Sequence, residues 1–403
     1  MPRDVVPRLA AGRALGTLAQ GLVGPALSWE LWERTHSKLV LALIGLTLVV
    51  PVIALFVPAG ELIDRVDRRR TAALTATGSA IVAAGLAVAS ATLAPLPIIF
   101  ALLFVQGCMT VLHSPSASSI VPLVVPREAL ERANRVTAST EEVARVVAPG
   151  IAALALAILP AAVTYSLAGA SALGAAVLYR GLPPPRVVAG DPSAVRDWRV
   201  GLRFILRSRL LLPALTLDMF AVLFAGATAL LPAISTDILG VGVIGFGALR
   251  AAPSIGAVLM AMGAAYLPAW KRPGRVLLTV VALYGATTLA FGLSHSFPLS
   301  ICLLVLMGAL DNISVVIRMT LEQMVVPDAI RGRVAAVYFV FIGMSNELGE
   351  AESGLAAALV GLVPAIAGGG AIAILVAGVI AIAARDLVRM PPLAELKPGD
   401  GER

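Results

Sequence analysis

The sequence predicts an all-α integral membrane protein with twelve transmembrane helices in two pseudo-repeat halves of six. Three observations lead to this prediction. Of the 403 residues, 59% are hydrophobic and only 14% are charged, whereas about 25% are charged in an average soluble domain. Apolar stretches of about 20 residues, the length that crosses a bilayer, alternate with short polar breaks. With 2 cysteines and no low-complexity tract, the chain resembles neither a disulfide scaffold nor a disordered protein.

The expected spans follow one another with short connections. The first span is the least apolar, because Arg13, Glu30 and Glu33 interrupt it. The twelve spans are residues 8–31, 39–60, 71–92, 97–118, 134–158, 160–180, 210–233, 242–267, 275–294, 298–322, 334–359 and 364–384.

The distribution of Lys and Arg predicts the orientation in the membrane. If the N-terminus lies in the cytoplasm, 25 of the 31 Lys and Arg residues fall on the cytoplasmic side, and only Arg34 and Lys38 fall on the other side. Cytoplasmic loops carry such an excess of positive residues. We therefore expect a multi-pass protein of a bacterial inner membrane with both termini in the cytoplasm. The net charge of +7 then reflects contact with the lipid bilayer, and no nucleic-acid partner is expected.

An internal repeat supports the division into two halves. When the sequence is shifted by 201 positions, Gly107 falls on Gly308, residues 124–126 fall on 325–327, and Arg132 falls on Arg333. Six-helix halves of this kind, with the substrate near the bilayer midplane, are one plan of secondary transporters. The expected parts are an N-terminal half (1–181), a cytoplasmic linker (182–209), a C-terminal half (210–385) and a cytoplasmic tail (386–403).

The linker is expected to contain an amphipathic helix. Val195, Trp198, Leu202 and Ile205 follow helical spacing, and arginines lie between them. A helix with this pattern lies in the plane of the membrane surface. We therefore expect residues 194–207 to form an interfacial helix.

The loop between the second and third spans carries a specific motif. Residues 60–70, GELIDRVDRRR, resemble the G-x-L-x-D-R-x-G-R-R signature of the major facilitator superfamily. Asp67 replaces the second glycine, as in the branch of enterobactin-exporter-like and macrolide-efflux-like drug:proton antiporters. Further stretches similar to this branch are residues 29–35, 125–134, 249–257 and 327–334. The resemblance implies the major facilitator fold and transport by alternating access.

The motif also implies a conformational latch. Gly60 permits close packing at a helix end, and Asp64 can accept hydrogen bonds from backbone donors at a neighbouring helix N-terminus. The resemblance implies that this contact closes the cytoplasmic side, with Arg65, Arg68 and Arg69 among lipid headgroups. The alternative is a plain positive-inside anchor, which explains the arginines but explains neither Gly60 nor Asp64.

Two other family motifs are altered. The fifth-span motif G-P-x-x-G-G reads APGIAA here, so Pro149 and Gly150 keep the expected helix kink while alanines replace close-packing glycines. In the fourth span, Leu103 stands where the family motif has an arginine before Gln106 and Gly107. A proton mechanism that depends on that arginine is therefore not expected.

Ionisable residues within the last spans are the clearest functional signal, because such groups are costly at membrane depth. The repeat places Asp311, Asn312 and Arg318 opposite Thr110, Val111 and Ala117, and it places Asn346, Glu347 and Glu350 opposite Arg145, Val146 and Pro149. With Arg250, the cluster has two arginines and three carboxylates. One carboxylate is left over and could carry a proton. A static ion-pair lock joining these spans is the equal alternative.

Other polar residues give weaker expectations. Asp218 has no partner nearby in sequence, which makes it a second proton-coupling candidate. Gln20, Gln106 and His113 are expected to line the cavity by family analogy, together with Asn312 and Asn346 of the cluster. His113 has a packing role as its alternative. We expect Glu141 to pair with Arg145 on one helix, and Arg13 to extend to the membrane surface.

These patterns predict a proton-coupled exporter of amphipathic, drug-like small molecules that acts as a monomer. A siderophore or lysophospholipid exporter with different coupling, and a non-transporting receptor or scaffold, are the alternatives. The sequence has no nucleotide-binding or nucleophile motif and no metal-ligand spacing. We therefore expect neither an enzyme, nor a cofactor, nor a metal site.

Overall fold

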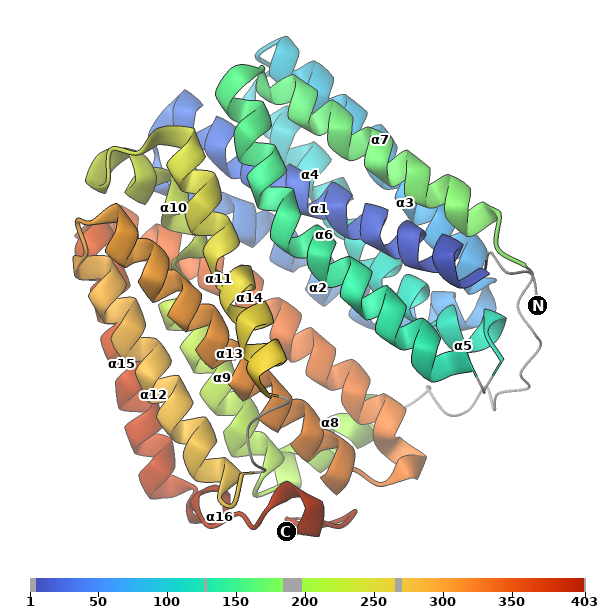
Figure 1. The fold of residues 1–403 in the computed structure, drawn as a ribbon, viewed down its shortest axis with the longest axis vertical. Helices are drawn as coiled ribbons and strands as arrows, with labels where there is room; N and C mark the ends of the chain where they lie inside the picture. Colours follow the sequence, from blue (N-terminus) through green and yellow to red (C-terminus); the bar gives the residue numbers. More distant parts are fainter. Residues whose placement is uncertain (1–4, 127–128, 184–197, 265–269, 402–403) are drawn as a thin grey trace. The chain divides into compact units, whose positions relative to one another are not determined.

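The computed structural model describes residues 5–126, 129–183, 198–264 and 270–401; the side chains of residues 56–65, 227, 264 and 339 are outside the described part. Long helices dominate it (Figure 1). Those before the linker are α1 (Val5–Thr35), α2 (Lys38–Arg65), α3 (Arg68–Ala91), α4 (Leu96–Ser118), α6 (Leu130–Ile158) and α7 (Ala161–Arg180). Those after it are α9 (Leu211–Ala225), α11 (Gly242–Ala264), α12 (Pro273–Leu293), α13 (Phe297–Val325), α14 (Arg331–Val360) and α15 (Leu362–Ala383).

Short elements connect the long helices. α9 continues into a broken segment that combines 3-10, α and π turns, and the tail begins with one short helix. The short elements are α5 (Val121–Val124), α8 (Trp198–Arg207), η2 (Ala227–Leu230), α10 (Leu231–Ala233), η3 (Ile234–Ile238), η4 (Asp328–Ile330), α16 (Arg385–Val388) and η5 (Leu393–Glu395).

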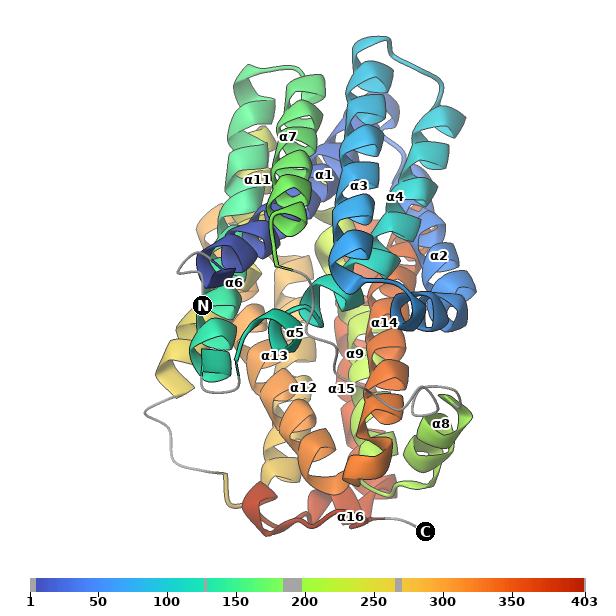
Figure 2. The same ribbon diagram turned by 90° about the vertical axis from the view of Figure 1, so that its right-hand side faces the viewer.

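Backbone contacts divide the chain into two compact units. The first unit comprises Met1–His36, Thr47–Asp191 and Val241–Ala251. In it α1 packs against α6 and α7, and α3 packs against α4 and α7 (Figures 1 and 2). Small residues make this close packing possible. Its core includes the fully buried Leu9 of α1 and Tyr179 of α7.

The second unit comprises Ser37–Leu46, Pro192–Gly240 and Ala252–Arg403. In it α12 packs against α13 and α15, and α9 packs against α14 and α15. The tail belongs to this unit too. The Gly399 N–H donates to the Val325 carbonyl over 2.9 Å, and the Arg209 N–H donates to the Gly401 carbonyl over 2.7 Å. These bonds tie the tail to the end of α13 and the start of α9.

The predicted helices are confirmed, and the chain is a multi-pass membrane protein. Each of the twelve expected spans falls on helical structure in its described residues, and nine of the described helices are long and apolar enough to cross a membrane. α1, α6 and α14 have 31, 29 and 30 residues but are more polar. At about 1.5 Å per residue each exceeds about 40 Å in length. A count of twelve spans therefore stays a prediction.

The internal repeat has a packing counterpart. A Cβ added to Gly107 of α4 would lie 3.0 Å from the Pro51 ring of α2, and one added to Gly308 of α13 would lie 1.8 Å from the Pro253 carbonyl oxygen of α11. Each glycine thus brings its helix against a proline-containing neighbour within its own unit. The close approach is tighter at Gly308, where the contact is with backbone.

The expected amphipathic helix of the linker is described in part. Helix α8 covers Trp198–Arg207, and the expected first residues, 194–197, lie outside the described part of the chain. Phe204 and Ile205 are buried while Arg199, Arg203 and Arg207 are exposed. The buried face packs against α14. Part of the apolar side of α8 is therefore buried against α14, while Leu206 stays exposed.

Candidate functional site

A buried ion pair joins α9 and α13 in the second unit. The Asp218 carboxylate lies 2.6 Å from the Arg318 guanidinium. Arg318 is 3% exposed, and it also donates to the Ser314 hydroxyl over 3.2 Å and to the Tyr338 hydroxyl of α14 over 3.3 Å. The structure thus supplies Asp218 with a partner from a helix distant in sequence, which the sequence spacing could not identify. These contacts hold three helices together.

Asp311 adds a second carboxylate to this cluster. It lies two helical turns before Arg318 on α13, and it lines the same small pocket as Asp218, Tyr284 and Ser314. Asp311 is exposed, and within the described residues its carboxylate makes no hydrogen bond or ion pair. It remains close enough to Asp218 and Arg318 to interact with them electrostatically. The cluster therefore holds two carboxylates and one guanidinium, which can fully neutralise only one of them.

The remaining polar residues of the predicted cluster do not line this pocket: Asn312, Asn346, Glu347 and Glu350 belong to the second unit, whereas Arg250 belongs to the first. The Thr228 hydroxyl donates to the Glu350 carboxylate over 3.4 Å. Glu347, Glu350 and Arg250 all have interaction partners. Asn346 is exposed and Asn312 is half-buried. The pocket beside Asp218 and Asp311 is lined by none of these five residues.

A second polar site lies within the first unit. Gln20 of α1 and both Gln106 and His113 of α4 line one pocket with Ser79 of α3. The Gln106 Nε2 donates to the Ser79 hydroxyl over 3.3 Å, whereas its buried Oε1 has no hydrogen-bond partner among the described residues. His113 Nδ1 lies 2.9 Å from the Thr75 hydroxyl. The structure thus brings together the three cavity candidates from this half.

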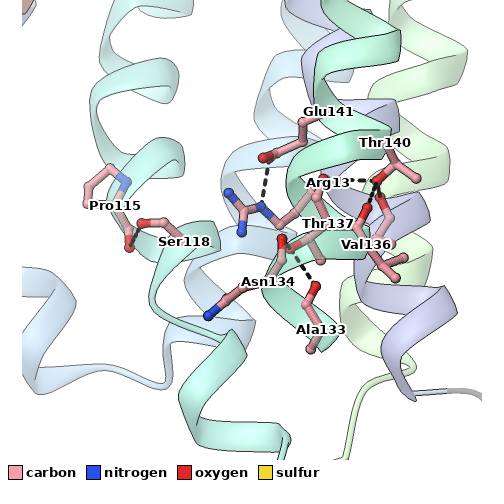
Figure 3. Close-up of polar contacts among 10 residues, drawn as sticks. Arg13, Pro115, Ser118, Ala133, Asn134, Val136, Thr137, Thr140 and Glu141 are labelled. Carbon is pink, nitrogen blue, oxygen red and sulfur yellow. Dashed lines mark hydrogen bonds and ion pairs between the residues drawn. The ribbon is translucent and has the colours of Figure 1, made fainter. Parts of the chain in front are cut away.

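Two pairing expectations for α1 and α6 are wrong. Arg13 does not extend to the membrane surface: its Nε lies 2.7 Å from the Glu141 carboxylate of α6 (Figure 3). Arg145 pairs instead with the neighbouring Glu142 over 3.0 Å, at an exposed position. The cause is the close approach of the helices, since a Cβ on Gly21 of α1 would lie 2.6 Å from the Ala148 Cβ of α6. A half-buried partner across this contact outcompetes a local one.

This contact also explains the altered fifth-span motif. Ala148, which precedes Pro149, packs against Gly21 of α1. The glycine of this contact is therefore on α1, where the family motif has it on the fifth span. Pro149 is buried and lies inside the continuous helix α6. A Cβ added to Gly150 would meet nothing within 4 Å. Close packing therefore survives the loss of the first motif glycine.

One buried site was missed in the sequence, which suggested only that charges interrupt the first span. Glu30 is 6% exposed, accepts a hydrogen bond from the Tyr165 hydroxyl of α7 over 2.7 Å, and forms an ion pair with Arg34. Arg34 also donates to the carbonyls of Ser90 and Ala94 over 3.2 Å each. The i,i+4 spacing of Glu30 and Arg34 was the available signal. The site ties α1 to α7 and to the end of α3.

The predicted latch lies mostly beyond the described side chains. Gly60, Asp64 and Arg65 belong to the segment 56–65, so their contacts are outside the described part. Arg69 is described, and it has protein partners besides any lipid headgroups. Its guanidinium donates to the Leu182 carbonyl over 2.5 Å and pairs with Asp67 over 3.3 Å. Arg68 also has an interaction partner.

Asp67 itself caps α3 by accepting from the Arg69 N–H over 3.0 Å. An acceptor side chain on the residue just before a helix satisfies a backbone N–H of the first turn that lacks an intrahelical partner. The replacement of the motif glycine by Asp67 therefore has a local structural role.

Among the described residues, no group of three His, Cys, Asp or Glu side chains could hold a metal ion.

Comparisons with known proteins agree with this architecture. The chain is 29% identical to macrolide efflux protein A of Streptococcus pyogenes over 56% of this chain and 58% of that protein. It is 28% identical to the enterobactin exporter EntS of Shigella boydii over 81% of this chain and 79% of that protein. The chain thus spans little more than half of the macrolide efflux protein that it matches. The crystal structure of a D-xylose-proton symporter superposes with a TM-score of 0.73 at 13% identity, covering 97% of this chain and 98% of that one.

The family assignment rests on a longer match. The sequence profile of the Major Facilitator Superfamily matches residues 9–350. That range takes in nearly all of the long helices before the linker and most of the second unit, including Asp218, Asp311 and Arg318. The chain therefore belongs to the Major Facilitator Superfamily.

Proposed function

We propose that this protein is a proton-coupled exporter of amphipathic small molecules that works by alternating access. It would act as a monomer of twelve spans in the bacterial inner membrane, with both termini in the cytoplasm. The two relatives named as exporters support the direction of transport. The surplus carboxylate of the Asp218–Arg318–Asp311 cluster supports proton coupling, and it is the observation that carries the proposal.

We assign the two roles that the sequence left as alternatives to different members of the cluster. Asp218 and Arg318 form the static pair that joins α9 to α13. Asp311 is the proton carrier, because it is accessible and needs a proton or a bound cation once the arginine is occupied. Proton binding at Asp311 would remove the surplus charge and so favour a state in which the pocket is closed to water. We assign this role to Asp311 in preference to Glu347 and Glu350, which have other partners.

Proton release from acidified everted membrane vesicles tests the coupling. The probes are erythromycin, enterobactin, tetraphenylphosphonium and a lysophospholipid, with empty-vector vesicles as the background. Wild-type vesicles should release protons on addition of at least one probe, and Asp311→Asn should abolish that release. Asp237→Asn is the matched control, because Asp237 is exposed and lies in the same unit.

The same assay can overturn the proposal. Full proton release by Asp311→Asn and by Asp218→Asn, each at wild-type expression, would exclude the cluster as the coupling site. Silence of the wild type with all four probes, while the pH gradient is intact, would contradict proton-coupled export of these classes.

Siderophore export is the second candidate function. The match to the enterobactin exporter covers 79% of that protein, which is more than the match to the macrolide efflux protein covers. A proton response to enterobactin alone would favour it. Enterobactin uptake into everted vesicles without any proton response would indicate siderophore export with a different coupling.

The latch is part of the proposed alternating-access cycle. Asp64→Asn would remove a charged acceptor from the end of α2 and weaken the closed state of the cytoplasmic side. Turnover should fall, while the amount of inserted protein stays unchanged. Wild-type turnover by the folded variant would contradict the latch, and the loop would then act only as a positive-inside anchor.

A further inference from the structure

The two small polar pockets occupy equivalent places in the internal repeat. The shift of 201 positions pairs four residues that line the first-unit pocket with four that line the second-unit pocket. Gln20, Ser79, Ala83 and His113 correspond to Ala221, Val280, Tyr284 and Ser314. Their chemistry differs, since the second-unit pocket holds two carboxylates and the first-unit pocket has no charged lining residue in the described part of the chain.

An unsatisfied side chain marks the first-unit pocket. Gln106 is 7% exposed, and one end of its amide is bonded to the Ser79 hydroxyl while the other end is buried without a partner in the described residues. A buried polar atom left without a hydrogen bond costs about 1–3 kcal/mol. Scaffolding does not require the amide, since the equivalent position in the second half is Met307. We therefore expect the Gln106 Oε1 to accept a hydrogen bond from a group that binds in the pocket.

Size and charge limit what that group can be. The cavity has a volume of about 20 Å³, and one water molecule needs about 10–15 Å³ on the same scale. Such a space admits a single functional group and not a whole molecule. A buried ammonium or carboxylate would need an ionic partner, and the described lining has none. A hydroxyl fits, because it can donate to the amide oxygen or accept from the amide nitrogen.

We propose that the Gln106 pocket binds a hydroxyl group of the transported molecule, as a subsite for its uncharged polar end. This inference rests on the proposed transport of amphipathic molecules. The pocket is reached from Gln20, which is exposed whereas Gln106 and His113 are buried. The first-unit pocket thus binds an uncharged group, whereas the equivalent pocket of the second unit binds the coupled proton at Asp311.

Binding of a matched pair of probes tests the subsite. 1-Naphthol carries one hydroxyl, and 1-methylnaphthalene replaces it by a methyl group of similar size. Equilibrium dialysis against the full-length protein in lipid nanodiscs, with empty nanodiscs subtracted, measures both affinities. Gln106→Met, which installs the residue of the equivalent position, should weaken 1-naphthol binding about tenfold. Binding of 1-methylnaphthalene should change less than twofold.

Two controls isolate the hydrogen bond and the proposed function. Gln323→Met makes the same change at an exposed position of α13 and should leave both probes unaffected. Asp237→Asn, the control variant of the coupling assay, should likewise keep full 1-naphthol binding. Because the dialysis uses no proton gradient, failure of the subsite and failure of proton coupling give different results.

Either of two results would overturn the subsite. Equal loss of both probes in Gln106→Met would mean that the pocket contributes only packing. Wild-type protein that binds 1-naphthol no more tightly than 1-methylnaphthalene would mean that water alone satisfies Gln106. The second result needs no variant, so the inference stays testable even where Gln106→Met is poorly folded.

Discussion

Removing one charge of the buried Asp218–Arg318 pair should cost more than removing both. Arg318→Gln leaves the Asp218 carboxylate buried without its partner, and such a change destabilises a protein by about 3–5 kcal/mol. The double variant Asp218→Asn, Arg318→Gln has no uncompensated charge at this pair. Thermal unfolding of the purified proteins should therefore rank the double variant above the Arg318→Gln single variant. Additive losses of stability would show that the two side chains do not act as a pair.

Two tyrosines of α7 offer a matched test of the Glu30 site. Tyr165 and Tyr179 are both fully buried, but the Tyr165 hydroxyl donates to Glu30 while the Tyr179 hydroxyl has no hydrogen-bond partner in the described residues. A hydrogen bond to a charged group contributes about 1.5–3 kcal/mol. Tyr165→Phe should lower the thermal unfolding midpoint, and Tyr179→Phe should leave it unchanged or raise it. Equal effects of the two changes would argue against a specific Tyr165–Glu30 bond.

At the level of helices, two glycines should respond oppositely to alanine. At Gly308 the new Cβ would lie 1.8 Å from a backbone carbonyl of α11, whereas at Gly150 it would meet nothing within 4 Å. Gly308→Ala must separate α13 from α11 and should reduce the yield of folded protein. Gly150→Ala gains helix propensity of up to about 1 kcal/mol. Size-exclusion profiles of the two solubilised variants compare them directly, and a normal profile for Gly308→Ala would contradict the close contact.

The helices themselves could be predicted from the sequence, because hydropathy and length decide which segments are helical in a membrane. Contacts between helices could not. Hydropathy places Asp218 and Arg318 in separate spans but says nothing of which faces meet. Local spacing favoured Glu141 with Arg145, whereas the Gly21–Ala148 contact brings Arg13 within 2.7 Å of Glu141. The repeat was more informative, since it identified Asp311 and Arg318 as polar additions to one half.

In the whole molecule, three long helices, α1, α6 and α14, carry more ionisable residues than a membrane span usually does. In α1 and α6 the charges are largely paired: Arg13 contacts Glu141, and Glu30 contacts Arg34. In α14 Glu350 accepts a hydrogen bond from Thr228. Pairing lowers the cost of placing ionisable groups at membrane depth. These helices can therefore cross the bilayer, which would bring the nine strongly apolar ones to the expected twelve.

Reporter fusions test that topology, because each span that fails to cross moves every later loop to the other side. Twelve spans require both termini on the same side of the membrane, and the distribution of Lys and Arg predicts that this side is the cytoplasm. Green fluorescent protein fused after Arg403 should fluoresce, and alkaline phosphatase inserted between His36 and Ser37, directly after α1, should be active. Activity at the second site depends on α1 crossing despite its charges. An inactive phosphatase there would place α1 on one side of the membrane, and a dark C-terminal fusion at normal expression would indicate an odd number of spans.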